Sequence, residues 1–321
     1  FLLNRSLAEA HLQRQLYSPD AILSMDVVIP DQNAYEIAFM CDRYWDRIIF
    51  GKQEPGNRWI RSYGDNPGDH TFSGPHAIAI DPFDTIFVAD TYNRKIAKLF
   101  YNRFSNSVSF VSQFPVPVGI NFPSDISFDQ GGYLPCFPDD GDGLWITDGG
   151  LGTIIKINRR FEVVKTITHY TYEGNTYRLQ HPRAVTSSPL GGPMMVIPFL
   201  GVIDKDRNAF ITLDASTVVN GTCPANYSSE FDPLTSELTC VGVDWFGEWW
   251  VGDKARRMHH KFSGNGEYLA SIEADADGNM LFSSPSSISK TRQLFSGECT
   301  SVFGRLNLVT ADLWGGTTGL R

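Results

Sequence analysis

Short apolar segments that end in aspartate recur along the whole chain. The clearest copies are Phe87–Asp90, Trp145–Asp148 and Val309–Asp312, and a few turn residues follow each of them. The closing aspartates are separated by 48, 58, 66, 39 and 59 residues, and they are Asp42, Asp90, Asp148, Asp214, Asp253 and Asp312. A repeat of short β-type segments at this spacing predicts stacked β-sheet units.

The second unit divides into four predicted strands, at 76–81, 85–90, 95–101 and 107–114. Four antiparallel strands joined by short turns make one blade of a β-propeller. The same template predicts strands in the first, third and fifth units at 21–28, 35–42, 47–53 and 58–64, at 124–129, 144–148, 153–158 and 161–167, and at 239–244, 248–253, 257–262 and 267–272. The sequence therefore predicts an all-β fold, a six-bladed β-propeller of four-stranded antiparallel blades.

The fourth and sixth units are less regular. In the fourth, 183–187 and 201–204 both compete for the innermost strand before 209–214. The sixth keeps 286–290 and 306–312, and only 317–321 remain for a third strand. Because an open sheet edge invites aggregation, we expect a segment before Ser18 to return and pair with this blade. The alternative is that Leu3, Leu7 and their apolar neighbours form an amphipathic helix. The predicted domains are an N-terminal extension, 1–17, and a single propeller, 18–321.

Residues 75–96 resemble an NHL repeat. Pro75–Asp81 reads Pro-His-Ala-Ile-Ala-Ile-Asp, and Ile86–Ile96 reads Ile-Phe-Val-Ala-Asp-Thr-Tyr-Asn-Arg-Lys-Ile. The family pattern is Pro-X-Gly-Ile-Ala-Val-Asp, a turn, Ile-Tyr-Val-Ala-Asp and Asn-X-Arg-Ile. The other five units keep the strand and aspartate but little else. Resemblance to the NHL family implies a six-bladed propeller and no single activity.

The charge and hydrophobicity of the chain limit the kinds of partner that we expect. The chain has 321 residues and a formal net charge of −9, with only 27 Lys and Arg residues. Nucleic-acid binding rests on phosphate neutralisation by such residues, so we do not expect nucleic acid as the partner. No apolar run of about 18 residues occurs, so the sequence predicts no membrane span.

Two kinds of sequence feature suggest a secreted or extracellular, or periplasmic, location. Cys223 and Cys240 flank a polar stretch that resembles a surface loop, and we expect a disulfide between them. Asn-X-Ser/Thr sequons occur at Asn4, Asn220 and Asn226.

The recurring aspartates are interpreted as structural turn caps. Six carboxylates at equivalent strand ends would ring one face of a propeller, which invites a metal-binding interpretation. An aspartate at a strand end also accepts backbone N–H bonds from the following turn, and this would repeat because the fold repeats. We therefore expect Asp42, Asp90, Asp148, Asp214, Asp253 and Asp312 to act as caps.

Metal-dependent catalysis has limited support. Some NHL propellers are peptidyl-hydroxyglycine amidating lyases, whose site resembles three Pro-His-X-Ile/Leu/Val segments converging on zinc; here only Pro75–Ile78 matches. A catalytic zinc needs about three protein ligands, and His76 alone cannot supply them. Two acidic stretches space oxygens like a calcium loop but lack its final glutamate, so structural calcium is an open possibility at Asp140 and Asp142 or at Asp275 and Asp277. We expect no cofactor.

The turns after the aspartates combine arginine with aromatic residues, a composition enriched at binding hot spots. The candidate binding residues are Arg43, Tyr44, Trp45, Tyr92, Arg94, Lys254, Arg256, Arg257 and Trp314. The sequence therefore predicts a non-catalytic binding or assembly module whose partner is a protein or another copy of the chain. The alternatives are a metal-dependent lyase or lactone hydrolase with an axial site, and glycan or RNA binding on these turns.

Overall fold

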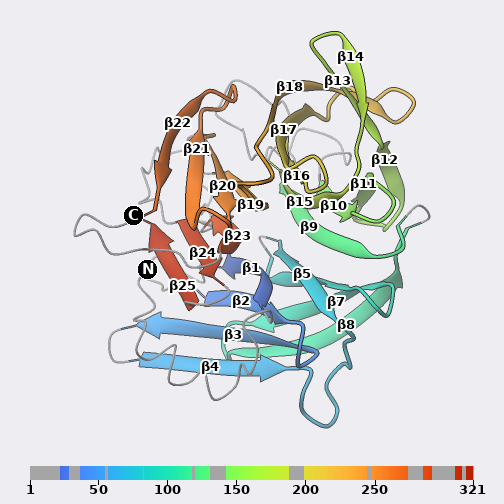
Figure 1. The fold of residues 1–321 in the computed structure, drawn as a ribbon. Coiled ribbons are helices and arrows are strands. Elements are labelled where there is room, and N and C mark those ends of the chain that lie inside the picture. The colour runs from blue at the N-terminus through green and yellow to red at the C-terminus, as the bar shows by residue number, and fades with distance from the viewer. Residues whose placement is uncertain are drawn as a thin grey trace, which may run out of the picture.

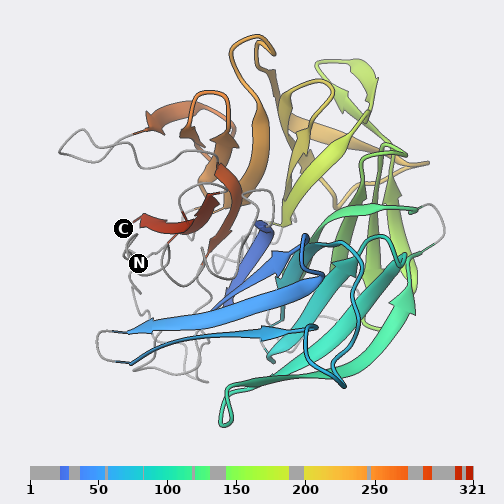
Figure 2. The same ribbon diagram turned by 60° about the horizontal axis from the view of Figure 1, so that its bottom comes forward.

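The protein folds into small β-sheets arranged around a common axis (Figures 1 and 2). The computed structural model describes residues 22–28, 37–54, 57–81, 83–117, 120–130, 142–187, 199–243, 247–273, 285–290, 308–312 and 316–320. Every regular element in these ranges is a β-strand. None of these residues forms a helix that could cross a bilayer.

Six sheets are present in the described ranges, and five of them have four strands or more. Blade one is β1 (Ile22–Val28), β2 (Ile37–Asp42), β3 (Arg47–Glu54) and β4 (Asn57–Tyr63). Blade two is β5 (Pro75–Ile80), β6 (Thr85–Asp90), β7 (Lys95–Asn102) and β8 (Ser107–Pro115). Blade three is β9 (Pro123–Gln130), β10 (Asp142–Asp148), β11 (Thr153–Asn158) and β12 (Val163–Ile167).

The remaining sheets differ in size. Blade four is β15 (Pro182–Ser187), β16 (Phe199–Asp204), β17 (Ala209–Asp214) and β18 (Thr222–Glu230), extended by β13 (His169–Tyr172) and β14 (Asn175–Arg178). Blade five is β19 (Leu238–Val243), β20 (Trp249–Asp253), β21 (Met258–Phe262) and β22 (Tyr268–Ile272). The last sheet has three strands, β23 (Pro285–Lys290), β24 (Leu308–Asp312) and β25 (Gly316–Leu320).

These strands confirm the predicted propeller. In blades one, two, three and five the strands lie within a few residues of their predicted positions. The described ranges contain five complete blades rather than the six predicted, and the last sheet has three strands within them. The predicted N-terminal extension, 1–17, lies outside the described residues.

The innermost strands pack against one another in chain order. β1 contacts β5, β5 contacts β9, β9 contacts β15, β15 contacts β19, β19 contacts β23, and β23 contacts β1. The apolar cores lie between neighbouring blades: Phe39 and Phe50 of blade one, for example, pack with Tyr101 of blade two. Inner strands such as β6, β16 and β20 alternate side chains toward both neighbouring blades, so both of their faces are buried and they are largely apolar. Outer strands such as β8 and β22 are mostly exposed.

A hairpin that the sequence did not predict joins blades three and four. The chain leaves β12, and β13 then pairs with β18 in parallel, with His169, Tyr170 and Thr171 opposite Thr222, Cys223 and Pro224. β14 pairs back onto β13 and forms the new outer edge (Figure 1). The Tyr170 and Tyr177 rings stack at 5.2 Å, and the Arg207 guanidinium lies 4.6 Å from the Tyr177 centroid. The hairpin therefore covers the outer edge of blade four.

The predicted disulfide is absent. Cys223 and Cys240 are both free and buried. Their flanks are not a surface loop, because Cys223 lies in β18 of blade four and Cys240 in β19 of blade five. Cys223 packs into the core between blades three and four, whereas Cys240 packs beside Trp250. Burial raises the pKa of each thiol to about 12, so both act as small apolar side chains.

Candidate functional site

In blades two to five, the aspartate at the end of the second strand bonds to the segment that enters the blade. Asp148 accepts the N–H groups of Asn121 and Phe122, at 2.6 and 3.0 Å, just before β9 begins. Asp90 accepts the Ser73 N–H at 2.7 Å in the same way before β5. A buried carboxylate with two or more backbone donors is satisfied within the fold.

In blade four, Asp204 rather than the predicted Asp214 ends the second strand. Asp214 ends β17, the third strand from the axis, and it bonds only to residues of its own turn, including the Ser216 N–H at 3.0 Å. Asp204 ends β16 and takes the equivalent place, where it accepts the Gln180 and His181 N–H groups at 2.9 and 2.8 Å. Asp214 thus accepts an N–H of the turn that follows it, but it ends the third strand of blade four rather than the second, because two adjacent strands of this blade both end in aspartate.

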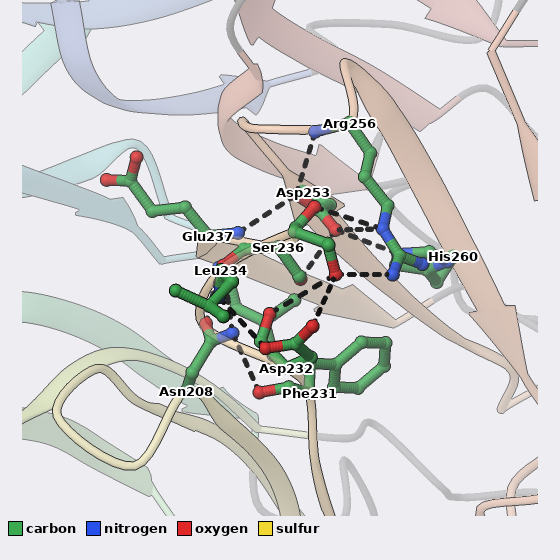
Figure 3. Close-up of polar contacts among 12 residues, drawn as sticks. Asn208, Phe231, Asp232, Leu234, Ser236, Glu237, Asp253, Arg256 and His260 are labelled. Carbon is green, nitrogen blue, oxygen red and sulfur yellow. Dashed lines mark hydrogen bonds and ion pairs between the residues drawn. The ribbon is translucent and has the colours of Figure 1, made fainter.

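The most extensive of these networks surrounds Asp253 (Figure 3). Its carboxylate accepts bonds from the Ser236 hydroxyl at 2.6 Å and from the Glu237 and Arg256 N–H groups at 3.1 Å. The His260 Nε2 atom lies 3.3 Å away. Burial alone would raise the pKa of Asp253, but these hydrogen bonds outweigh it and lower the pKa to about 2.

Ser236, Asp253 and His260 do not form a nucleophilic triad. The aspartate stands between the serine and the histidine, whereas activation of a serine needs the histidine beside the hydroxyl. All three side chains are buried. The arrangement is therefore a structural network that joins the entry of blade five to β20 and β21. Asp42 lies in a similar setting, bonded to the buried Arg47 side chain at 2.9 Å. The side chain of Asp312 lies outside the described part of the chain.

A β-bulge follows the first residue of five innermost strands. In each, the pairing register skips the second residue, and these residues are His76, Ser124, Arg183, Thr239 and Ser286. Bulges re-aim side chains and are frequent at binding sites. Since the innermost strands pack in a ring, the bulges place these residues around one mouth of the axis, which we call the axial mouth.

His76 is the histidine that the sequence singled out at this mouth. Its Nδ1 atom lies 2.7 Å from the Ser124 carbonyl oxygen, and because a carbonyl only accepts, Nδ1 carries the hydrogen and Nε2 a lone pair. Burial lowers the pKa of His76, the charges of Arg43 and Arg183 lower it further, and the bond to Ser124 opposes them; the pKa is about 4. His76 is therefore neutral at pH 7.

Below the mouth, polar side chains of the innermost strands bond to neighbouring strands. The Asp125 carboxylate accepts the Val185 N–H at 2.8 Å, which joins blades three and four. The Ser187 hydroxyl donates to the Phe128 carbonyl at 2.9 Å, and the Thr186 hydroxyl donates to the Val241 carbonyl at 2.8 Å. These groups are used to hold the blades together.

No metal site is formed by the described residues. Within them, no three His, Cys, Asp or Glu side chains come together in a way that could hold a metal ion. The calcium candidates Asp140, Asp275 and Asp277 lie outside the described residues; Asp142 begins β10, but its side chain is not described. The side-chain charges that shift the pKa of His76 are those of Arg43 and Arg183, and both lower it. The lyase alternative therefore has no ligand set in the described residues.

The predicted aromatic and arginine residues of blades one and two come together. Tyr44, Trp45 and Tyr92 are exposed on the turns that join second to third strands, and the Tyr44 and Trp45 rings meet edge to face at 5.5 Å. Arg43 donates to the Tyr92 hydroxyl, with its guanidinium 5.3 Å from the ring centroid.

Sequence reasoning missed one member of this surface. The Arg94 guanidinium lies 5.2 Å from the ring of the exposed Phe122, which precedes blade three. A phenylalanine directly before the proline that starts an innermost strand was the available signal. We call the six residues Arg43, Tyr44, Trp45, Tyr92, Arg94 and Phe122 the turn band.

The predicted basic residues of blade five lie apart from the turn band. Arg256 bonds to the Thr235 carbonyl at 3.1 Å and to its hydroxyl at 3.0 Å. Lys254 lies 3.9 Å from Glu237, and Arg257 is exposed. Trp314 lies outside the described residues. Blade five thus contributes a separate basic turn.

This fold and this surface define a β-propeller with an arginine and aromatic face. No protein-family model matches the chain, and no curated protein sequence matches it either. Its resemblance to NHL repeats therefore rests on blade two.

Solved propellers of several kinds share the fold. A streptogramin B lyase structure matches with a TM-score of 0.52 and 14% identity, over 94% of this chain and 79% of that one. Virginiamycin B lyase from Staphylococcus aureus matches with a TM-score of 0.50 and 14% identity, over 94% and 80%. Hydrazine synthase from Kuenenia stuttgartiensis matches with a TM-score of 0.52 and 11% identity, over 94% and 95%. At such identities the likeness concerns the fold alone.

Proposed function

We propose that this propeller is a non-catalytic binding module that docks a protein partner on the turn band, and that the partner is a second copy of the chain. The observation that carries the proposal is the cluster of exposed rings with arginines held over or beside them. Tyr, Trp and Arg are the residue types that dominate binding hot spots, and clustered exposed apolar side chains mark interaction surfaces.

Charge favours a second copy as the partner. The chain has a net charge of −9, whereas the turn band carries Arg43 and Arg94, and the exposed Asp46 beside it already accepts the Gly74 N–H at 2.6 Å. A basic patch on an acidic protein is complementary to the other surfaces of an identical molecule. Such a contact is head-to-tail, so it builds rings or open filaments rather than symmetric dimers alone.

Self-association tests this proposal. We expect sedimentation velocity to show an average mass that rises with protein concentration, and we expect the double variant Tyr44→Ala/Trp45→Ala to remain monomeric over the same range. Removing two hot-spot rings typically weakens an interface by at least tenfold each.

The matched control is Phe104→Ala. Phe104 is fully exposed, at 101% of the reference area, but it lies in the turn between β7 and β8, at the other end of its blade. A wild-type protein that stays monomeric at all concentrations would contradict the proposal, as would equal effects of both variants. The RNA and glycan alternatives instead require binding that weakens steeply as salt rises.

We further propose that the three-stranded sheet is the sixth blade of an NHL-like ring, and that residues before Ser18 supply its outer strand. β23 packs between β19 and β1, so this sheet fills the place of one blade. Hydrogen exchange on the full chain should show β25 amides as protected as those of β21, which an open edge at β25 would not permit.

An extracellular location is proposed from the sequons. Asn220 is exposed in the turn before β18 with φ of 49°, and Asn226 is exposed within β18. We expect protein made in a eukaryotic secretory pathway to lose mass on treatment with an N-glycosidase, and Asn220→Gln to remove most of that loss, since a turn tip is the more accessible site. A mass unchanged by the enzyme would contradict this prediction.

A further inference from the structure

The outer strands of four blades share a β-bulge at one pairing position. In each blade the register with the third strand skips one residue, and these residues are Val111 of β8, Val164 of β12, Asn226 of β18 and Leu269 of β22. β12 and β22 begin at the residue just before the bulge, whereas β8 and β18 begin three residues earlier. β8 and β18 therefore share an added section, Ser107–Ser109 and Thr222–Pro224, in which Val108 corresponds to Cys223.

In blade four another strand covers the added section. β13 lies in parallel against it, with His169–Thr171 opposite Thr222–Pro224 (Figure 1). The His169 N–H donates to the Gly221 carbonyl at 3.1 Å, on the side of β18, whereas the Thr168 carbonyl accepts the Leu179 N–H at 2.9 Å on the other side. Backbone groups of successive strand residues point to opposite sides, so alternate residues of β13 bond to β18.

In blade two the same section lies at the edge of its sheet. Its inner side pairs with β7, with Ser107–Ser109 opposite Asn102, Tyr101 and Phe100. β8 is the last strand of this sheet, so within the described part of the chain no strand pairs with its outer side. The next residue, Phe110, is contacted by the His70 ring, which stacks on it at 4.6 Å. The open edge is therefore Ser107–Ser109, which we call the docking edge.

The sequence of β8 does not protect this edge from pairing. Proteins commonly place charged side chains on exposed edge strands to prevent another chain from pairing there. The outer strand of blade one, β4, carries Arg58 and Arg61 in this way, whereas none of the residues of β8 is charged. The exposed side chains of Phe100, Phe104 and Val111 lie on or next to β8. The docking edge is thus suited to an uncharged strand with apolar side chains.

We propose that the docking edge binds an uncharged, extended segment of a partner protein, which adds to blade two as a fifth strand parallel to β8. Strand β13 supplies the model for this occupant, because it covers the corresponding section of β18 with the sequence His-Tyr-Thr-Tyr. Main-chain hydrogen bonds give such strand addition its affinity. The docking edge shares no residue with the turn band, so this proposal and the proposed self-association can fail independently.

Titration of the full chain with the peptide Thr-His-Tyr-Thr-Tyr tests the proposal. This probe has the sequence of residues 168–172, with both ends blocked so that it has no terminal charge. Binding is followed by backbone amide NMR signals and by hydrogen exchange. We expect saturable changes centred on Val108, and exchange of its amide at least tenfold slower at saturating peptide, since a new hydrogen bond protects it. The amides of β12 and β22, which lack the added section, should not change.

Two methylated peptides separate strand pairing from contact between side chains. Methylation of the backbone nitrogens of the histidine and the second threonine removes the donors that β13 directs toward β18. We expect this peptide to bind at least tenfold more weakly, because two hydrogen bonds are lost and the methyl groups lie against the edge. The matched control is methylated only at the nitrogen of the central tyrosine, which points to the other side, and it should keep its affinity.

The wild-type chain is used throughout, so no result depends on whether a variant folds. Protection of β8 that is lost with the first methylated peptide and kept with the second supports the proposal. No change in β8 at millimolar peptide overturns it, and so do equal affinities of the two methylated peptides or changes confined to β18. Protection of β8 that rises with protein concentration in the absence of peptide would mean that a second copy covers the edge, which also overturns the assignment.

Discussion

Asp204→Ala is expected to lower the free energy of unfolding by about 3 kcal/mol, whereas Asp214→Ala should lower it by about 1 kcal/mol or less. The two aspartates end neighbouring apolar strands of blade four, so their local sequences are similar. Asp204 is fully buried and accepts the N–H groups of Gln180 and His181 in the segment that enters the blade. Asp214 bonds only within its own exposed turn.

The physical reason for the difference is what each change leaves unpaired. Asp204→Ala removes two charge-assisted hydrogen bonds and leaves backbone donors without an acceptor at the junction of blades three and four. Asp214→Ala frees groups that water can reach. Denaturant titration followed by tryptophan fluorescence measures both values. Equal destabilisation by both variants would mean that the Asp204 carboxylate is not what holds the segment before β15 in place.

Acid is expected to destabilise the protein through His259. This side chain is fully buried in β21, and burial together with the neighbouring His260 lowers its pKa to about 3. The ordinary pKa of histidine is about 6.5, so the unfolded chain takes up a proton at a higher pH than the folded protein does. The contribution of neutral His259 to the free energy of unfolding is therefore fully present above pH 6.5, and it is lost as the pH falls toward 3.

His259→Leu tests this prediction. Between pH 7 and pH 4 the wild type should lose about 3 kcal/mol through this one residue, and the leucine variant should lose that much less over the same interval. Asp253 does not obscure the comparison, because its pKa of about 2 places its loss of stability below pH 4. His169→Leu, which changes a partly exposed histidine of the added hairpin, is the matched control for the loss of a histidine. The same pH dependence in the wild type and in His259→Leu would contradict the prediction.

The sequence was sufficient for the parts of the fold that repeat. The strands of blades one, two, three and five could be placed because each unit keeps its period and its closing aspartate. Blade four could not be divided correctly, because β16 and β17 both end in aspartate and only pairing decides which is second. The hairpin β13–β14 could not be predicted from the sequence, for a related reason. Its parallel pairing with β18 joins residues about 50 positions apart, which no local pattern reports.

The candidate site was predicted in part. Arg43, Tyr44, Trp45, Tyr92 and Arg94 were chosen for their residue types, and the structure brings them together across blades one and two. Phe122 was missed because it lies before an innermost strand rather than after an aspartate. The surroundings of His76 could not be predicted either, since its Nδ1–H is donated to the carbonyl of Ser124 in the next blade.

The parallel pairing of β13 with β18 changes how the propeller comes apart. In a simple ring the outer strand of one blade leads directly to the innermost strand of the next. Here the chain leaves β12 and immediately completes the edge of blade four, so pulling blade three away would also strip that edge. Blades three and four therefore form one cooperative unfolding unit, and a cut chain that separates them should not reassemble from its two fragments.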